Sequence, residues 1–344
     1  MVNRPLRVLL VGGGRAGLVH GKNFAAGVRG GRLVGVADPD PAALDRAVKE
    51  LECDLAFSDP NRAVVDHRID AVVIASPTFT HAELAKSALA AGKHVLCEKP
   101  LASSLDEAQQ VEEAVARSEA VFLMAFMRRF DVGFRRAAER LAAGDIGEPL
   151  LIRSTSRGPG LPPEWAWDVE QSGGLVAEVN SHDLDTLRWL SGQEFRRVFA
   201  LGRAAKRPEI AERYPGFTDL IVATFEMTGA TIGQVDGACP ADYAYDARVE
   251  VYGSEGMLLA GDPRAHATLL VRRDGVVADP VPSWRTLFAA AYRAEDEHLV
   301  AVARGEEEPL TSVRDGLAAL EAALAVNRAM ALGQPTDVGG PVSA

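Results

Sequence analysis

Short apolar runs and stretches of helical composition alternate over the first third of the chain. The apolar runs predict strands at Arg7–Val11, Leu33–Ala37, Ala71–Ala75, His94–Cys97 and Val121–Phe126. Helical composition predicts helices from about Arg15, over Pro41–Leu51, over Glu83–Ala91 and from the capping box Ser104–Glu107. Strands that alternate with helices form parallel sheets that carry helices on both faces. We therefore expect an α/β domain, a doubly wound parallel sheet, over residues 1–126.

After residue 126 the apolar runs follow one another with few helices between them. They predict strands at Leu150–Ser156, Thr218–Glu226, Thr231–Asp236 and Ala247–Gly253. Helical composition predicts helices from Asp131 to Gly144, over Leu175–Leu190 and from about Thr311 to Leu332. Strands joined without helices are typical of hairpins. We expect an α+β domain over residues 127–344, built on a mostly antiparallel open sheet with helices on the face toward the first domain.

Length, composition and charge agree with this division and exclude other classes of protein. The 344 residues suit about two domains of ~150 residues each. Hydrophobic residues make up 47% of the chain and charged residues 25%, as in globular proteins. A formal net charge of −11 repels phosphate backbones, so no nucleic-acid partner is expected. No apolar run reaches the ~18 residues of a membrane helix, and the N-terminus does not resemble a signal peptide. We expect no membrane association.

The cysteines give no sign of disulfides or of a metal site. Cys53, Cys97 and Cys239 are widely spaced and have no histidine or cysteine at metal-ligand spacing. They are interpreted as free thiols in a reducing cytosol. The sequence therefore predicts a cytoplasmic protein without a metal.

A glycine-rich turn stands between the first predicted strand and the first predicted helix. Gly12, Gly14 and Gly17 follow the pattern G-x-G-x-x-G, with Arg15 and Ala16 inside it. In this context the first glycine permits the tight turn, the second lets the backbone approach a pyrophosphate, and the third lets helix pack on strand. The alternative is a glycine turn that serves packing alone. The position between strand and helix favours a dinucleotide site.

Asp38 ends the next predicted strand, 21 residues after Gly17. A carboxylate at this place can accept hydrogen bonds from the adenosine ribose. Together with Asp40 it would repel a 2′-phosphate. We expect NAD as the cofactor, with NADP disfavoured.

Two further segments leave the carboxyl ends of predicted strands, where open α/β sheets bind ligands. Glu98-Lys99-Pro100 follows His94–Cys97, which would direct Lys99 into the ligand crevice. Ser76, Thr78 and His81 follow a neighbouring strand and could line the nicotinamide ribose. A surface role for Lys99 and a helix-capping role for His81 are the alternatives.

A line of polar residues is predicted on one helix of the second domain. Glu178, His182 and Asp185 stand at i, i+4 and i+7 among apolar neighbours. Carboxylates aligned with a histidine orient the imidazole and raise its basicity, as a general base requires. A histidine that only packs is the alternative. A metal site lacks a second histidine or cysteine.

Arg128 and Arg129 lie where the two domains are expected to meet. One of them could bind substrate hydroxyls or the cofactor, and the other would form an ordinary ion pair. The sequence does not distinguish the two.

These motifs in this order resemble the glucose-fructose oxidoreductase and inositol dehydrogenase family (Gfo/Idh/MocA). The resemblance rests on the glycine turn, on Ser76-Pro77-Thr78 with His81, on the segment from Ala91 to Pro100, and on Gly173 to Asp185, and it spans nearly the whole chain. Phe126 to Asp131 and Gly144 to Leu150 look most like the inositol 2-dehydrogenase branch. The resemblance implies an NAD(P)-dependent oxidoreductase of polyols or sugars, assembled as a dimer or tetramer through the open sheet.

The resemblance also implies roles for single residues. Lys99 matches the family's catalytic lysine, His182 its catalytic histidine, and Glu178 an acidic position usually held by aspartate. Tyr245 is similar to a substrate-contacting tyrosine. The extra methylene of Glu178 changes the reach of its carboxylate.

A second departure from the family precedes Gly173. Inositol dehydrogenases can carry an Asp-Asn pair there, whereas this chain has Trp165 and Trp167. Either indole could stack against the apolar face of a sugar or belong to the core. We take Trp167 as the candidate substrate contact.

The hypothesis drawn from these residues is the reversible oxidation of a secondary hydroxyl on a cyclic polyol or sugar. His182 takes the hydroxyl proton, Lys99 stabilises the alkoxide and hydride passes to the nicotinamide; Lys99 and His182 can exchange roles. Substrate contacts are expected from Lys99, Arg128, Trp167, Glu178, His182 and Tyr245. Two alternatives use the same scaffold: a redox-assisted glycosidase or lyase with tightly held NAD, and a non-catalytic sensor of dinucleotide and sugar.

Overall fold

The chain folds into two compact units, and each unit combines two separate segments of the sequence. The computed structural model describes residues 4–339. The first unit comprises the chain up to Phe130 together with Ala289–Leu317, and the second comprises Asp131–Phe288 and the chain from Ala318 onward.

The first unit is a doubly wound parallel sheet, as predicted. Within the described residues it has six strands in the order β3-β2-β1-β4-β5-β6. The strands are β1 (Leu6–Val11), β2 (Gly31–Ala37), β3 (Leu55–Phe57), β4 (Ala71–Ile74), β5 (His94–Glu98) and β6 (Phe122–Ala125). Strand order reverses between β1 and β4, so their carboxyl ends border the crevice where such sheets bind ligands.

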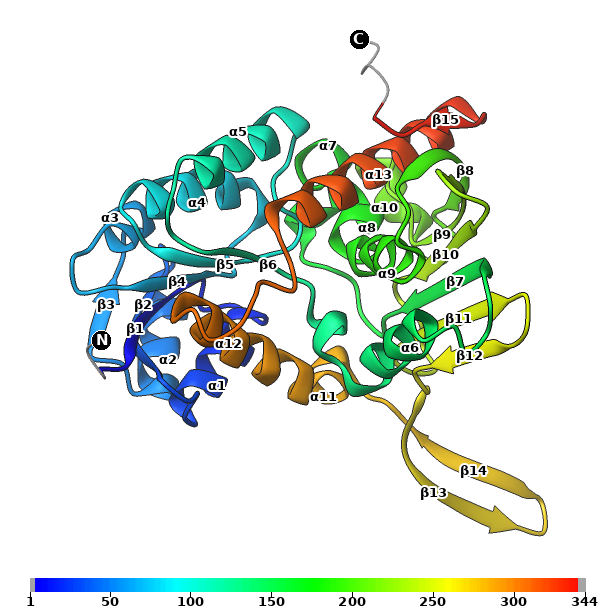
Figure 1. Ribbon diagram of the computed structural model, residues 1–344, viewed down its shortest axis with the longest axis horizontal. Coiled ribbons are helices and arrows are strands. Elements are labelled where there is room, and N and C mark those ends of the chain that lie inside the picture. The colour runs from blue at the N-terminus through cyan, green and yellow to red at the C-terminus, as the bar shows by residue number, and fades with distance from the viewer. Residues whose placement is uncertain (1–3, 340–344) are drawn as a thin grey trace. The chain divides into compact units, whose positions relative to one another are not determined.

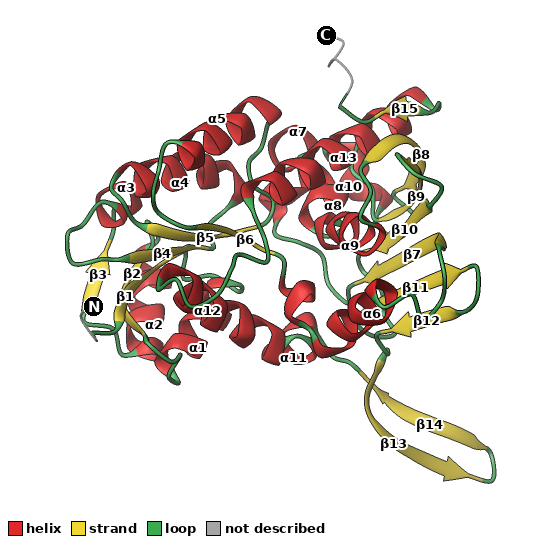
Figure 2. Ribbon diagram, in the orientation of Figure 1, coloured by secondary structure: helices red, strands yellow, loops and turns green. Residues whose placement is uncertain are grey.

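Helices cover both faces of this sheet (Figures 1 and 2). One face carries α3 (Pro60–Val64), α4 (His81–Ala90) and α5 (Leu105–Ala116), and the other carries α1 (Gly17–Ala25), α2 (Pro41–Leu51) and α12 (Ala289–Ala303). Val8, Leu10 and Leu96 are at most 1% exposed. Burial on both faces explains why the central strands are continuous apolar runs.

Helix α12 returns to the first unit after the chain has formed most of the second. The sequence pattern assigned all residues after 126 to the second domain, and the structure differs there. Leu299 and Val300 of α12 pack into the same apolar core as Val8 and Phe24. Burial of this face against α1 and the sheet is the physical reason for the return.

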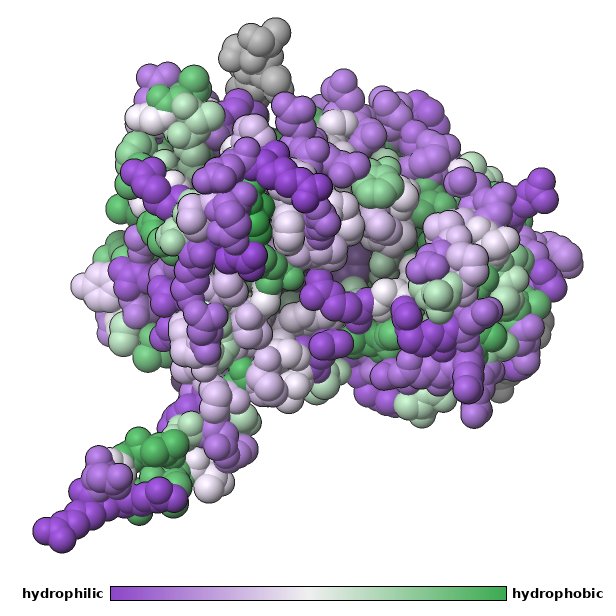
Figure 3. All heavy atoms as spheres, turned by 180° about the vertical axis from the view of Figure 1, so that it is seen from behind, coloured by the Kyte–Doolittle hydropathy of each residue, from purple (hydrophilic) through white to green (hydrophobic). Residues whose placement is uncertain are grey.

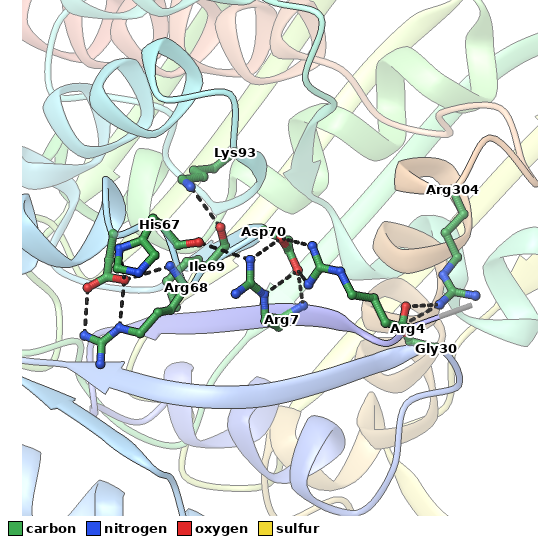
Figure 4. Close-up of polar contacts among 10 residues, drawn as sticks. Arg4, Arg7, Gly30, His67, Arg68, Ile69, Asp70, Lys93 and Arg304 are labelled. Carbon is green, nitrogen blue, oxygen red and sulfur yellow. Dashed lines mark hydrogen bonds and ion pairs between the residues drawn. The ribbon is translucent and has the colours of Figure 1, made fainter. Parts of the chain in front are cut away.

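An ion cluster fixes the amino ends of the central strands (Figure 4). Asp70, directly before β4, accepts hydrogen bonds from Arg7 Nε at 2.9 Å and from Arg4 Nη1 at 2.9 Å. Its carboxylate also accepts the backbone N–H of Arg7 at 2.9 Å. Although partial burial alone would raise the pKa of Asp70, the bonds from the two arginines hold it well below its usual range. Asp70 thereby joins β1 to β4 at the edge opposite the ligand crevice.

The second unit is built on an open, mostly antiparallel sheet, as predicted. Among the described residues its order is β12-β11-β7-β10-β9-β8-β15. The strands are β7 (Pro149–Arg157), β8 (Phe195–Arg203), β9 (Leu220–Met227), β10 (Ile232–Ala238), β11 (Asp246–Gly253), β12 (Met257–Ala260) and β15 (Thr336–Asp337). The predicted strand Leu150–Ser156 is not a hairpin neighbour of Thr218–Glu226, because β10 lies between β7 and β9 and runs parallel to β7.

One face of this sheet packs on helices, and side chains on the other are exposed. Val198, Ile221 and Phe225 are fully buried, whereas the alternate residues Phe199 and Val222 are 42% and 40% exposed. The helices of the unit are α6 (Val132–Ala142), α7 (Val169–Ser172), α8 (Gly174–Glu178), α9 (Ser181–Ser191), α10 (Pro208–Arg213), α11 (Trp284–Leu287) and, from Ala318 on, α13 (Val313–Leu332). No helix within residues 4–339 is long and apolar enough to cross a membrane.

The single helix predicted over Leu175–Leu190 is two helices, α8 and α9. The backbone leaves helical geometry at Val179 (φ −114°, ψ −50°) and Asn180 (φ −85°, ψ 0°). The side-chain amide of Asn180 donates to Asp183 Oδ2 at 2.7 Å, which offers a local alternative to the helical hydrogen bonds. The break changes which side chains share one helix face.

A separate hairpin follows β12 and was missed from the sequence. Strands β13 (Arg264–Arg272) and β14 (Gly275–Pro280) pair only with each other among the described residues. The ribbon projects from the second unit (Figure 1), and apolar residues lie along it behind a polar tip (Figure 3). With both faces exposed, this segment lacks the regular alternation that identifies a half-buried strand.

Candidate functional site

The glycine turn between β1 and α1 has two glycines required by packing and one that faces open space. A Cβ on Gly12 would lie 2.6 Å from the carbonyl oxygen of Ala75, and one on Gly17 would lie 1.9 Å from that of Gly12. Gly12 also has a φ of +97°, which favours glycine. A Cβ on Gly14 would meet no atom within 4 Å. The turn therefore fits a pyrophosphate approaching the backbone at Gly14.

Asp38, which the spacing predicted as a ribose contact, lies against this turn. Its Oδ2 accepts the backbone N–H of Gly13 at 2.7 Å, and its Oδ1 accepts that of Asp40 at 2.9 Å. Asp40 caps α2 through the N–H of Ala42. The carboxylate of Asp38 thus braces the turn and stands at the end of β2, where a ribose could bind. Arg15 is exposed and Ala16 half-buried just before α1.

The loop after β4 is tied to the loop after β5 through His81. The ring of His81 is 1% exposed; its Nε2 lies 2.8 Å from the carbonyl oxygen of Ser76 and its Nδ1 lies 2.7 Å from that of Pro100. Burial lowers the pKa of His81 despite these two acceptors. Thr78 is buried in the same loop. His81 opens α4, but its ring holds two strand ends together.

Glu98 and Lys99 stand at the carboxyl end of β5. Glu98 is 5% exposed, and its Oε2 accepts the backbone N–H of Lys99 at 3.1 Å. The Oε1 of Glu98 lies 3.4 Å from Nε2 of His20 on α1. Burial alone would raise the pKa of Glu98, but the hydrogen bond and charge of His20, with the charge of Lys99, lower it. An ionised carboxylate therefore stands directly beside the lysine that sequence reasoning singled out.

The structure distinguishes the two arginines of the turn Met127–Phe130. Arg129 forms an ion pair with Asp315 at 2.9 Å and donates to the carbonyl oxygen of Leu310 at 2.7 Å. Arg128 is 1% exposed, although its side chain is long and charged. Arg129 thus forms the ordinary ion pair, and Arg128 is buried in the same turn.

In the second unit the continuous helix that was predicted to carry the polar line was wrong. Glu178 ends α8, while His182 and Asp185 belong to α9, so the break at Asn180 removes the i, i+4, i+7 relation on a continuous helix. His182 is 7% exposed and Asp185 is 2% exposed.

A buried polar network holds the start of α9 and thereby the backbone of His182. Asp183 accepts from Asn180 at 2.7 Å and from the hydroxyl of Ser154 on β7 at 2.6 Å. The hydroxyl of Thr186 donates to the carbonyl oxygen of His182 at 2.6 Å. The network fixes α9 to the sheet.

The aromatic candidates are packed to different degrees. The indole N–H of Trp167 donates to the carbonyl oxygen of Pro162 at 3.0 Å, and its ring meets those of Tyr214 and Phe217 edge-on. Tyr245 is 8% exposed and packs edge-on against Phe288 with centroids 6.2 Å apart. Trp165 and Trp167 are both half-buried, in the turn that begins at the exposed Glu164. Each unit therefore gathers its own part of the predicted site.

Sequence reasoning missed a group of polar residues behind Glu98: the buried His20 and Asp296 and the half-buried Asn23. His20 and Asp296 lie 276 positions apart in the chain. A histidine in the first turns of the glycine-turn helix, three residues after Gly17, was the available signal. Within residues 4–339 no group of three or more histidine, cysteine or acidic residues could hold a metal ion.

Comparison with known proteins places the chain in a family. The description "Oxidoreductase family, NAD-binding Rossmann fold" matches residues 6–126, and "GFO/IDH/MocA C-terminal domain" matches residues 134–259. The chain belongs to the Gfo/Idh/MocA family. The resemblance identified from the motifs is thereby confirmed, and residues 6–126 form its NAD-binding Rossmann domain.

Members of this family that are similar to the chain over nearly their full length include inositol dehydrogenases. It is 32% identical to scyllo-inositol 2-dehydrogenase (NAD(+)) of Bacillus subtilis, over 98% of the chain and 97% of that protein. It is 31% identical to myo-inositol 2-dehydrogenase of Thermotoga maritima, over 92% of the chain and 93% of that protein. The crystal structure of scyllo-inositol dehydrogenase from Lactobacillus casei with bound NAD(H) and scyllo-inositol superposes with a TM-score of 0.92 at 29% identity, covering 98% and 100% of the two chains.

Proposed function

We propose that the protein is an NAD-dependent dehydrogenase that oxidises a secondary hydroxyl of a cyclic polyol of the inositol class. The observation that carries the proposal is its full-length similarity to inositol 2-dehydrogenases of the Gfo/Idh/MocA family. The braced glycine turn and the Glu98-Lys99 strand end, which the sequence predicted independently, support it. None of these features favours the glycosidase, lyase or sensor alternatives.

The first domain, proposed over residues 1–126, holds the cofactor. The proposed cofactor-binding residues lie at the glycine turn, at the end of β2 and in the loops after β4 and β5: Gly12, Gly14, Arg15, Ala16, Gly17, Asp38, Ser76, Thr78, His81, Glu98 and Lys99. When bound, NAD supplies the acceptor for hydride. The N-terminal amides of α1 favour the pyrophosphate.

Lys99, His182 and Glu178 are proposed as the catalytic residues. His182 accepts the hydroxyl proton, and Lys99 donates a hydrogen bond to the oxygen as negative charge develops on it. Glu178 orients either His182 or a substrate hydroxyl, with one methylene more reach than the aspartate usual in the family. His182 and Lys99 can exchange roles without changing the overall reaction.

Further substrate contacts are proposed from Arg128, Trp167 and Tyr245, in addition to Lys99, Glu178 and His182. Arg128 can donate to polyol hydroxyls through a rigid guanidinium fork. Trp167 offers an apolar ring for the axial face of a polyol ring. The second unit, which contains Trp167, Tyr245, Glu178 and His182, would thus bind the substrate and mediate oligomerisation.

We propose a cytoplasmic homodimer or homotetramer. On the exposed face of the second sheet, Leu201 is 55%, Ile232 is 49% and Tyr252 is 53% exposed. On the hairpin, Val271 is 71% and Val276 is 62% exposed. Apolar residues gathered on one sheet face and continued along a hairpin are typical of surfaces that associate. A second copy of the chain is the occupant we propose.

The test is NADH formation, followed by absorbance, over a panel of inositols, aldoses and glycosides with NAD and with NADP. Turnover of one or more inositols with NAD, and slower turnover with NADP, is the expected result. Release of free sugar from a glycoside without net NADH would indicate the lyase. Binding of NADH without turnover of any compound would indicate the sensor.

A further inference from the structure

A buried ionisable cluster lies behind the end of β5, within the first unit. It joins His20 on α1, Glu98 on β5 and Asp296 on α12. His20 and Asp296 are fully buried and Glu98 is 5% exposed. Charged groups are rarely buried to this extent unless they are paired, because desolvation is costly.

The imidazole of His20 lies between the two carboxylates. Its Nδ1 is 2.7 Å from Asp296 Oδ1 and its Nε2 is 3.4 Å from Glu98 Oε1. Asn23, one turn further along α1, donates to the second oxygen of Asp296 at 2.8 Å. The second oxygen of Glu98 accepts the backbone N–H of Lys99 at 3.1 Å. A continuous chain of polar contacts therefore runs from α12 through α1 to Lys99.

The charges in this cluster favour a protonated histidine. Burial opposes the charge, but the hydrogen bonds and charges of Asp296 and Glu98 outweigh it and raise the pKa of His20 well above its ordinary value. Burial raises the pKa of Asp296 despite its contact with His20. The edge of Tyr292 packs on the imidazole, with ring centroids 5.3 Å apart, and excludes water from that side. A positive charge in the first turns of a helix opposes the helix dipole, so the carboxylates must supply the stabilisation.

We propose that His20 and Asp296 are positioning residues that hold Glu98 ionised and oriented beside Lys99. The inference rests on the proposed catalytic role of Lys99. Glu98 in turn fixes the backbone of Lys99 and supplies a counter-charge near its side chain. Because His20 lies on the helix that begins at the glycine turn, the same contacts tie the cofactor-binding helix to the catalytic lysine.

The proposal predicts opposite pH dependences for two variants. In His20→Gln, Glu98 loses its cationic partner while Lys99 and His81 remain nearby. The buried carboxyl then takes up a proton more easily, and kcat falls as the pH is lowered. In Asp296→Asn, His20 loses its closer carboxylate, so burial dominates, the pKa of His20 falls, and the imidazole loses its proton at a lower pH than in the wild type. Its kcat therefore falls as the pH is raised.

The experiment measures kcat and KM against pH for both variants and for the wild type with an inositol substrate. At the unfavourable pH we expect kcat to fall about 10-fold or more, a part of the ~10²-fold effect of a general acid or base. NADH affinity, measured by fluorescence titration, should change less than about 3-fold. The matched control is His298→Gln, which removes another buried histidine of α12 that contacts a carboxylate, that of Glu307 at 2.6 Å.

A second readout does not depend on turnover. NMR of histidine ring nitrogens should show His20 protonated in the wild type at neutral pH and neutral in Asp296→Asn. A neutral His20 in the wild type, or kcat losses in both variants that match the control and do not depend on pH, would overturn the inference. Wild-type protein that turns over no polyol, while His20 titrates as expected, would instead contradict the proposed function.

Discussion

At the scale of single residues, the structure shows that several of the predicted site residues hold the loops and turns around them in place. Asp38, His81 and Arg129 each have backbone or carboxylate partners that fix strand ends or turns. Sequence reasoning found Asp38 and His81 because each is near a motif in the chain. It could not find Asp296, whose contact with His20 depends on the return of a helix distant in sequence.

His182 gives the first residue-scale prediction. If its imidazole accepts the hydroxyl proton, His182→Ala should lower kcat by ~10²-fold or more, because proton transfer to a positioned base contributes at least that much. The NADH affinity, measured by fluorescence titration, should not change, since the proposed cofactor contacts lie in the first domain. His94→Ala, which removes a half-buried histidine at the opposite end of β5, serves as the control. Full activity of His182→Ala would refute the assignment.

Asp38 gives the second residue-scale prediction. Its carboxylate has two separable roles: it accepts the backbone N–H of Gly13, and its negative charge disfavours a 2′-phosphate. Asp38→Asn keeps an oxygen that can accept the N–H of Gly13 but removes the negative charge that disfavours a 2′-phosphate. We expect the ratio of kcat/KM for NAD over NADP to fall by about 10-fold, the equivalent of ~1.4 kcal/mol. Asp38→Ala should in addition weaken NADH binding, since it also releases the turn. An unchanged cofactor ratio in Asp38→Asn would show that another residue selects the cofactor.

At the scale of elements, strands and helices with a buried side were predictable and those without one were not. Strands β1, β4 and β5 are apolar runs, and Ser104 and Asp131 cap the helices that follow them, as predicted. The short β3 and α3, the exposed hairpin and α12 were missed. In α12 the side chains of Glu295, Asp296 and His298 are buried. Because these buried residues are polar, the buried face of the helix does not form an apolar pattern in the sequence. The break between α8 and α9 was also hidden, because Asn180 acts through contacts with Asp183.

The joint between β1 and β4 provides an element-scale prediction. Asp70→Asn should lower the free energy of unfolding by about 1–3 kcal/mol at pH 7, because two arginines and a backbone N–H lose a charged acceptor. The pKa of Asp70 is lowered in the folded protein, so its contribution is complete above about pH 4, the unfolded value, and is lost as the pH falls further. Urea unfolding of the wild type and of Asp70→Asn, at pH 7 and below about pH 4, measures this difference in the free energy of unfolding. Asp66→Asn, which removes a local pair with Arg68, is the control, and an equal loss in both variants would contradict the prediction.

At the scale of the whole molecule, the residues proposed as catalytic are distributed over two compact units. Lys99 belongs to the first unit and His182 to the second, so the sequence could predict both residues but not their distance. Each half is stabilised inside its own unit, by Glu98 and His20 in one and by the Asp183 network in the other. Mutations of His20 or of the Asp183 network should therefore alter kcat without preventing NADH from binding.

The exposed apolar surface of the second unit gives the last prediction. If the open sheet face and the hairpin associate with a second copy, Leu201→Asp should reduce the mass measured by light scattering after size exclusion, because a carboxylate buried in an interface is unpaired. A hairpin variant, Val271→Asp, should also reduce the measured mass if the hairpin is part of that interface. Val132→Asp on α6, where the side chain is 79% exposed outside both surfaces, is the matched control and should leave the mass unchanged. A wild-type monomer would refute the oligomer, whereas dissociation by Leu201→Asp alone would restrict the interface to the sheet and leave the hairpin free for another partner.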